Sequence, residues 1–310
     1  MSIILLPLPG YEQLAQGIAQ ALKLPSSDNY AAIERFPDGE AYHRMPDVRG
    51  RHVVFVGGTV DDAHFLELCD SASAAVMYGA KKVTLQVPYF GYSTMERAVK
   101  TGEVVKAKTR ARLLSSIPRS PLGNEIHLVD LHTEGLVHYF ENGVFARHIY
   151  ANRVICAGIL AHAAGSPIVL GSVDAGRSKW VQSLAHDLGV PAAFALKQRI
   201  SATETKLIAL SQTEFDPKAV VFIYDDMIRT GGSLIEAAKA YAAAGAKRIV
   251  AVATHGVLPA QSLSRIEACG LIEKVIVTDS HTQAIALSKS SKFITILSLA
   301  NTLAEPLAST

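Results

Sequence analysis

The chain has 310 residues, about twice a common domain, and 49% hydrophobic with 19% charged residues excludes a disordered protein. Thirty Lys and Arg against 28 Asp and Glu give a formal charge of +2, which does not indicate a protein that coats nucleic acid. No apolar run approaches the roughly 18 residues that span a bilayer, and the 3 cysteines follow neither metal-ligand nor disulfide spacing. These features predict a cytoplasmic protein with no nucleic-acid partner and no membrane partner.

Short apolar runs alternate with longer helical stretches along the chain. The expected strands are a buried first strand within residues 1–10, then Val53–Val56, Val83–Val87, Ile126–Val129, Ile168–Leu170, Ala219–Tyr224, Ile249–Ala253 and Val275–Val277. The expected helices are Tyr11–Leu22, Ala63–Tyr78, Asn152–Ala164 and Ser233–Ala244. Continuous apolar strands between helices are typical of βαβ units around a parallel sheet, so the pattern predicts an α/β protein.

The pattern also indicates two domains. The segment 79–91 is weakly similar to 245–257: each has a helix-ending glycine, a basic pair and an apolar strand. Turn residues near 141–150 interrupt the pattern, so we expect domains at 1–147 and 148–310. The polar stretch Lys197–Ser211 is predicted to be a mobile loop.

The strongest chemical signal follows the strand that ends at Tyr224. Two adjacent carboxylates precede a Gly-Gly turn into a helix, in the order Asp225, Asp226, Met227, Ile228, Arg229, Thr230, Gly231, Gly232, Ser233. Glycines let the backbone wrap closely around a ligand, and the amides of a helix start favour a phosphate. The carboxylates suit sugar hydroxyls or Mg²⁺. The alternative is an ordinary strand–turn–helix junction with an Asp cap; the spacing of a P-loop is missing.

This segment resembles the ribose-5-phosphate motif of type I phosphoribosyltransferases and ribose-phosphate pyrophosphokinases. The rest of the chain is similar to the second family. The segments that carry this resemblance, in order, are 36–40 (Phe-Pro-Asp-Gly-Glu), 88–92 (Pro-Tyr-Phe-Gly-Tyr), 130–132 (Asp-Leu-His), 172–176 (Ser-Val-Asp-Ala-Gly), 197–199 (Lys-Gln-Arg) and 254–256 (Thr-His-Gly).

The resemblance implies two doubly wound parallel-sheet lobes of phosphoribosyltransferase (type I) type, with the active site between them. It also implies an enzyme that transfers the β,γ-diphosphoryl group of ATP to the 1-hydroxyl of ribose 5-phosphate, with Mg²⁺ as cofactor. A homo-oligomer is implied, with dimers inside hexamers and adenine sites completed by a neighbour.

The same resemblance assigns roles to residues. Those implied to bind ATP are Phe36, Asp38, Glu40, Arg97 and His132. Those implied to bind ribose 5-phosphate are Asp225, Asp226, Arg229, Thr230, Gly231, Gly232 and Ser233. Mg²⁺ is assigned to His132 and Asp174, and catalysis to Lys197 and Arg199, which would neutralise charge in the transition state.

The chain departs from the family pattern at several positions. Thr94 and Met95 stand where an Arg and a Gln usually contact ATP, which removes charge-assisted hydrogen bonds. Arg229 replaces the commonest aspartate of the phosphate loop, Arg177 replaces a glycine, and Trp180 replaces an arginine. Two alternatives therefore stay open: a non-catalytic regulatory homologue, and a type I phosphoribosyltransferase.

Overall fold

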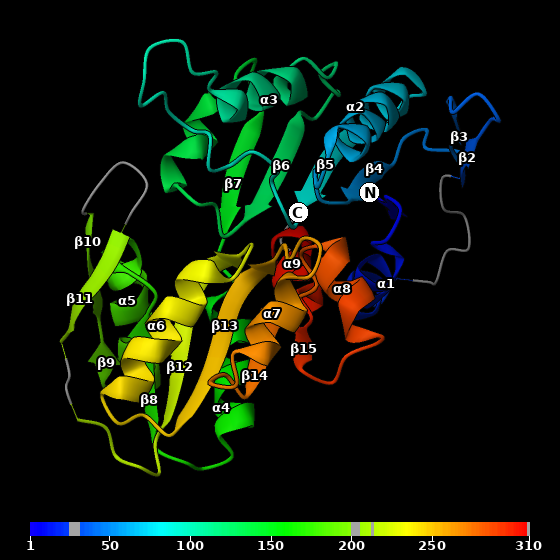
Figure 1. Cartoon of the computed structure of the whole chain (residues 1–310). Helices are drawn as coiled ribbons and strands as arrows, with labels where there is room; N and C mark the ends of the chain where they lie inside the picture. The colour runs from blue at the N-terminus through cyan, green and yellow to red at the C-terminus, as the bar shows by residue number, and fades with distance from the viewer. Residues whose placement is uncertain (25–31, 200–204, 212–213, 309–310) are drawn as a thin grey trace. The chain divides into compact units, whose positions relative to one another are not determined.

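The computed structural model describes residues 1–24, 32–199, 205–211 and 214–308, except for the side chains of 32–33, 196–199 and 205–209. The chain forms two compact units (Figure 1). Unit 1 is Met1–Tyr150 together with Ser298–Thr310, and unit 2 is Ala151–Leu297. None of the helices within these described ranges has both the length and the apolar character that a membrane span requires.

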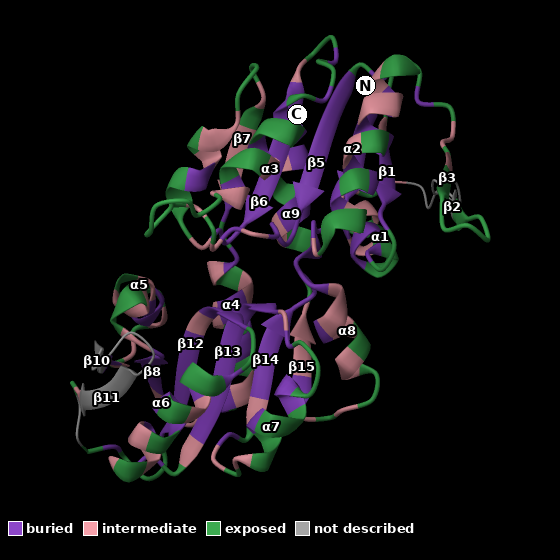
Figure 2. Cartoon of the chain, turned by 45° about the horizontal axis from the view of Figure 1, so that its top comes forward, coloured by how far each residue is buried: buried purple, intermediate pink, exposed green. Residues whose placement is uncertain are grey.

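Unit 1 is built on a parallel sheet in the order β1-β4-β5-β6-β7. Its strands are β1 (Ile3–Pro7), β4 (His52–Val56), β5 (Lys82–Val87), β6 (Asn124–Val129) and β7 (Phe145–Ile149), with a separate antiparallel hairpin of β2 (Ala32–Arg35) and β3 (Ala41–Arg44). Its helices are α1 (Glu12–Ala21), α2 (Asp62–Met77), α3 (Lys106–Ser115), the 3₁₀ helix η1 (Glu134–Tyr139) and α9 (Ala300–Ala308). Strands β4 and β5 are buried along their whole length, as Figure 2 shows for β5, and this burial explains why most of their residues are apolar.

The last helix, α9, belongs to unit 1 although it follows unit 2 in the chain. It packs against α1, where a Cβ on Gly17 would lie 2.8 Å from Ala300 Cβ. Gln86 Nε2 on β5 also donates a hydrogen bond to the Leu303 carbonyl, 3.0 Å away. Our expected second domain, 148–310, included this helix; these contacts place it on the first sheet.

Unit 2 contains a second parallel sheet in the order β15-β14-β13-β12-β8-β9. Its strands are β8 (Ile168–Ser172), β9 (Ala192–Ala193), β12 (Val220–Ile228), β13 (Arg248–Gly256), β14 (Lys274–Thr278) and β15 (Ile294–Leu297), and β10 (Ala195–Arg199) pairs with β11 (Thr205–Leu210) in a separate ribbon. Its helices are α4 (Asn152–Ala163), the 3₁₀ helix η2 (Ala175–Arg177), α5 (Ser178–Leu188), α6 (Gly232–Ala243), α7 (Ser262–Ala268) and α8 (Thr282–Ser288). The strands expected from the apolar runs are therefore confirmed.

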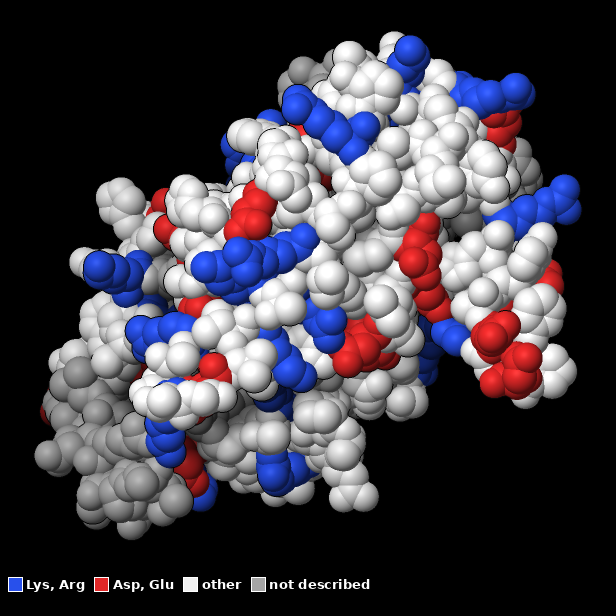
Figure 3. Space-filling model, turned by 90° about the horizontal axis from the view of Figure 1, so that it is seen from above, with Lys and Arg blue, Asp and Glu red and all other residues white. Residues whose placement is uncertain are grey.

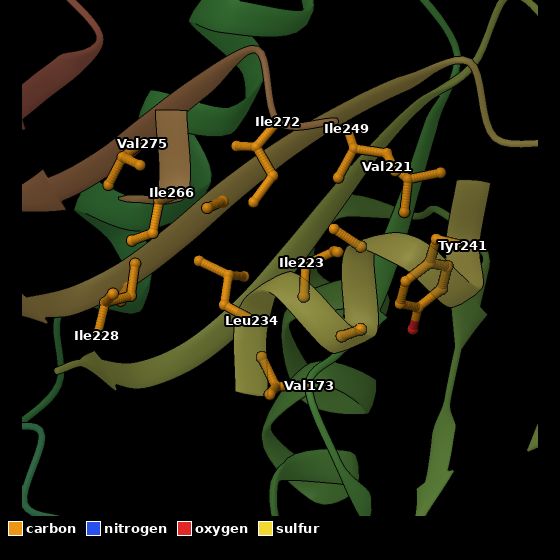
Figure 4. Close-up of a cluster of buried hydrophobic side chains, with 14 of the residues drawn as sticks. Val173, Val221, Ile223, Ile228, Leu234, Tyr241, Ile249, Ile266, Ile272 and Val275 are labelled. Atoms are coloured by element: carbon orange, nitrogen blue, oxygen red, sulfur yellow. The ribbon is translucent and has the colours of Figure 1, made fainter. Parts of the chain in front are cut away.

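Both faces of β12 are covered. Val221 and Ile223 lie in a cluster with Leu234 and Tyr241 of α6 (Figure 4). Phe222, which points to the opposite face because side chains alternate along a strand, meets the ring of His162 on α4 at 6.0 Å between centroids. This two-sided burial fixes the strand whose end carries the Asp-Asp motif.

The order of strands reverses beside β12. After β8 the chain adds β9 on one side, and β12 then pairs on the other side of β8. In an open α/β sheet, ligands bind beyond the carboxyl ends of the strands at such a switch point. The loops after β8 and β12 are therefore the expected ligand-binding loops of unit 2.

The stretch Lys197–Ser211, which we expected to be a mobile loop, contains paired backbone in its described residues, and residues 200–204 lie outside the description. Residues 197–199 and 205–210 belong to β10 and β11, which pair antiparallel with an irregularity between Leu196 and Lys197. An antiparallel ribbon does not need a continuous apolar run because it can leave one face to solvent. The polar composition of this stretch therefore gave a wrong prediction for these strand residues.

Candidate functional site

The loop between β12 and α6 depends on Gly231. Its φ of +76° lies in the left-handed region, and a Cβ there would lie 2.5 Å from Cγ1 of Ile266. The end of β12 is fixed as well, because the amides of Val257 and Leu258 both donate to the carbonyl of Ile228. This local geometry admits only glycine at position 231 without strain or displacement.

The start of α6 presents its backbone to solvent. Thr230, Gly232 and Ser233 are exposed, and within the described part of the chain no side chain caps the first turn of the helix. The first amides of a helix have no partner inside the helix and carry the positive end of its dipole. The loop is therefore suited to a phosphate group.

Two carboxylates stand beside this loop and share one guanidinium. Arg177 Nη2 lies 2.7 Å from Asp226 Oδ2, and its Nε lies 3.6 Å from Asp225 Oδ1. The Arg177 side chain is 11% exposed and that of Asp226 is 8% exposed, so these charges are largely removed from solvent. Burial raises the pKa of Asp225 well above its usual range, Asp226 alongside raises it further, and Arg177 opposes the rise.

Asp174 follows β8 on the neighbouring strand of the sheet. Its Oδ1 accepts a hydrogen bond of 3.0 Å from the amide of Gly176 and so caps the short helix η2, which ends at Arg177. Just before it, Ser172 Oγ accepts a hydrogen bond from the amide of Ala195. The loop after β8 thus brings Asp174 and Arg177 to the same sheet edge as the Asp-Asp motif.

In unit 1, residues Asp130–His132 follow the end of β6. Asp130 is buried and has a φ of +36°, and the amide of Leu131 donates to His148 Nε2 at 3.1 Å. His132 is half-buried. A strained, anchored segment at the carboxyl edge of a sheet is a common place for a binding residue.

Phe36, Asp38 and Glu40 lie together at the tip of the β2–β3 hairpin, where all three are exposed. The turn closes through Phe36 N to the Glu40 carbonyl and through Asp38 Oδ1, which accepts from Glu40 N. An ion pair between Arg35 and Glu67 joins the hairpin to α2. The hairpin therefore presents an aromatic ring and two carboxylates outward.

The basic residues near Thr94 and Met95 divide into two kinds. Arg110 lies 2.6 Å from Asp62 and stacks near the rings of Phe65 and Tyr92, so it holds the structure together. Arg97 has a side chain that is 78% exposed, with a weak contact of 3.5 Å to Glu96. Arg97 thus remains accessible to a ligand, whereas Arg110 is committed to packing.

The structure brings together the residues assigned to ribose 5-phosphate, with Asp174 beside them. The residues assigned to ATP lie on separate loops of unit 1. His132 belongs to unit 1 and Asp174 to unit 2, and among the described residues no group of three or more His, Cys, Asp or Glu side chains forms a metal site. The backbone of Lys197 and Arg199 lies on β10, but the structure does not describe the side chains of these two residues.

Sequence reasoning missed the role of Arg177. We noted it only as a replaced glycine, whereas it pairs with both members of the Asp-Asp motif. Arg177 lies only three residues after Asp174, but nothing in the sequence shows that β8 pairs with β12. Basic and acidic side chains otherwise occur in scattered groups on the face shown in Figure 3.

Comparisons with known proteins identify the family of the chain. Residues 3–117 match the family model of the N-terminal domain of ribose phosphate pyrophosphokinase, and residues 216–308 match that of the phosphoribosyl synthetase-associated domain. The chain is 32% identical over 298 residues to a ribose-phosphate pyrophosphokinase of Vibrio parahaemolyticus, covering 94% of this chain and 91% of the relative. A relative of the same name from Maricaulis maris is 30% identical, with 87% and 84% covered.

A solved structure supports the fold over the whole chain. The crystal structure of phosphoribosylpyrophosphate synthetase from Mycobacterium smegmatis matches with a TM-score of 0.84 at 26% identity, covering 100% of this chain and 98% of that one. The expected α/β fold with parallel sheets, of phosphoribosyltransferase type, is thereby confirmed. With this fold, two matching family models and a relative at 32% identity over most of both chains, the chain belongs to the ribose-phosphate pyrophosphokinase family.

Proposed function

We propose that this protein is a Mg²⁺-dependent enzyme that transfers the β,γ-diphosphoryl group of ATP to the 1-hydroxyl of ribose 5-phosphate. The products are 5-phosphoribosyl 1-pyrophosphate and AMP. The observation that carries the proposal is the loop at the end of β12, where uncapped helix amides and two carboxylates lie at the switch point of the sheet. Family membership supplies the reaction class.

Unit 2 would bind the sugar phosphate. The amides of Thr230–Ser233 suit the 5-phosphate, because Thr230, Gly232 and Ser233 are exposed and the helix dipole is positive there. Arg229 is exposed beside them and adds a compatible positive charge. Asp225, with Asp226, would accept hydrogen bonds from ribose hydroxyls and so orient the 1-hydroxyl.

Unit 1 would bind ATP. Phe36, Asp38 and Glu40 offer a ring and acceptors to adenine, while Arg97 and His132 offer contacts to the phosphates. In the reaction the 1-hydroxyl oxygen forms a bond to the β-phosphorus, the bond from that phosphorus to the bridging oxygen of AMP breaks, and the hydroxyl proton is lost. Lys197 and Arg199 would neutralise the charge that develops on the transferring group.

The residues proposed to hold Mg²⁺ are Asp174 of unit 2, whose half-buried carboxylate is the kind of oxygen ligand that this ion prefers, and His132 of unit 1. Mg²⁺ needs few protein ligands because it keeps several waters. Bound there with ATP, the ion would offset negative charge on the phosphate oxygens. Its presence stays a proposal, as does assembly into dimers and hexamers, which sedimentation of the purified chain would test.

The test is direct. The purified protein is incubated with ATP, Mg²⁺ and ribose 5-phosphate, and AMP and the pyrophosphorylated pentose are followed by phosphorus NMR. Both should appear together, and Asp225→Ala should abolish them. A panel of other nucleoside triphosphates and ADP tests the effect of Thr94 and Met95.

If ligands bind but no donor gives product, the chain is a non-catalytic homologue. If the protein instead consumes the pyrophosphorylated sugar with a base, it is a phosphoribosyltransferase.

A further inference from the structure

Adjacent carboxylates at a buried sheet edge need a positive partner. Asp225 and Asp226 are adjacent carboxyl groups with side chains only 26% and 8% exposed. Removing two like charges from water without compensation is costly. A divalent metal ion is one way to neutralise such a pair, and a fixed cationic side chain is another.

Arg177 provides the second solution. One edge of its guanidinium faces both acids, with Nη2 2.7 Å from Asp226 Oδ2 and Nε 3.6 Å from Asp225 Oδ1. Arg177 is the last residue of the short helix η2, which Asp174 caps. Its backbone position is therefore set by the loop after β8 and not only by the two acids. A guanidinium keeps its charge at all ordinary pH values and offers a planar set of donors that matches carboxylates.

A metal ion and this guanidinium compete for the same carboxylate edge. A divalent ion bound by Asp226 Oδ2 would stand next to the charge of Arg177 in a site with little solvent screening, which is strongly repulsive. The ion would therefore have to displace a side chain that is 11% exposed and already paired. The arrangement favours the guanidinium as the resident cation.

We propose that Arg177 takes the place of a divalent cation at Asp225 and Asp226, so that the sugar-phosphate loop binds ribose 5-phosphate without a metal ion at this pair. The identity of the sugar ligand rests on the proposed function. The role of Arg177 as the built-in cation rests on its contacts alone. Arg177 is thus a positioning residue that keeps both carboxylates in place for the sugar hydroxyls.

The first experiment needs no sugar. Binding of Mn²⁺ to the ligand-free protein is counted by electron paramagnetic resonance for the wild type, Arg177→Met and Arg177→Lys. The methionine keeps most of the buried stem and removes the charge, whereas the lysine keeps the charge. Arg177→Met should bind one Mn²⁺ more per chain than the wild type, the double variant Arg177→Met, Asp226→Asn should lose it again, and Arg177→Lys should match the wild type.

A matched control is Arg248→Met, which removes an ion pair to Glu273 elsewhere in unit 2. It should bind as many Mn²⁺ ions as the wild type. Equal Mn²⁺ counts for the wild type and Arg177→Met overturn the proposal. If Arg177→Met does not fold, the wild-type titration below still decides it.

The second experiment titrates ribose 5-phosphate by calorimetry in chelator and then in Mg²⁺. The wild type should bind equally well in both, whereas Arg177→Met should bind about tenfold or more weakly in chelator, since a charge-assisted contact is lost, and should recover in Mg²⁺. A wild type that requires Mg²⁺ to bind the sugar phosphate overturns the proposal. A wild type that binds no ribose 5-phosphate in either buffer overturns the proposed function instead. The number of Mn²⁺ ions bound in the first experiment then tests the role of Arg177 by itself.

Discussion

The hydroxyl of Tyr241 on α6 lies within hydrogen-bond distance of the carbonyls of Ser172, at 3.1 Å, and Ala193, at 2.9 Å. Gly171 makes room for the ring, since a Cβ there would lie 2.8 Å from it. Tyr241 therefore ties the ends of β8 and β9 to α6, the helix that follows the loop at the end of β12.

Replacing Tyr241 by Phe should weaken unit 2. The tyrosine is fully buried, and burial raises the pKa of its hydroxyl above the usual range, so the group stays protonated and donates. Its loss leaves buried carbonyls with fewer partners, which should lower the free energy of unfolding by about 1–3 kcal/mol. Urea unfolding measures this. Tyr78→Phe, at a residue that is 65% exposed, is the control and should change little; equal shifts for both variants would contradict the role of Tyr241.

Two neighbouring glycines should respond differently to alanine. Gly231→Ala places a side chain at φ +76° against Ile266, which costs about 1–2 kcal/mol for the backbone alone and displaces the loop. Gly232→Ala meets nothing closer than 4.0 Å, so the fold should tolerate it. Thermal unfolding should show a clear loss for the first variant and almost none for the second. If both variants lowered the unfolding midpoint to the same extent, the left-handed conformation of Gly231 would not be the reason why position 231 requires glycine.

Much of unit 2 was predictable because its information is local. A run such as Val221–Tyr224 has no polar interruption, and the Asp-Asp and Gly-Gly pairs follow it directly, so strand, loop and helix start could be placed together. The β2–β3 hairpin is different. Its strands have four residues each and its tip is exposed, so the sequence contains no apolar periodicity that predicts the hairpin.

The features that escaped prediction depend on which strands are neighbours. The contact of Gln86 with Leu303 joins residues 217 positions apart, and nothing near residue 303 indicates the sheet of unit 1 as its partner. Arg177 reaches Asp226 only because β8 pairs with β12, and strand order is a property of the whole fold. The residues of the loop after β12 could thus be named from the sequence, but the arginine that pairs with Asp225 and Asp226 could not.

Arg97 and Arg110 should give opposite results when each is replaced by Met. Arg110→Met loses an ion pair and two ring contacts at a side chain that is 19% exposed, so the melting temperature should fall. Arg97→Met should leave the melting temperature unchanged because its side chain is 78% exposed. If Arg97 binds ATP, the same variant should bind ATP about tenfold more weakly, as expected for the loss of a charged contact. Titration with ATP tests this prediction. If Arg97→Met binds ATP as tightly as the wild type, Arg97 does not contact the nucleotide.

His52 should make unit 1 sensitive to mild acid. Burial, with a smaller contribution from Lys82, lowers its pKa to about 4, and Nε2 lies 2.7 Å from Thr84 Oγ1. The unfolded chain takes up a proton near pH 6.5 that the folded chain refuses until about pH 4, so the free energy of unfolding falls as the pH drops between these values, by about 3 kcal/mol in all. His52→Gln keeps a side chain that can bond Thr84 and removes the titration. Urea unfolding across this pH range should therefore show a shallower slope for His52→Gln, whereas Thr84→Val should lose stability at every pH and keep the wild-type slope. An unchanged slope in His52→Gln would show that another group causes the loss of stability in acid.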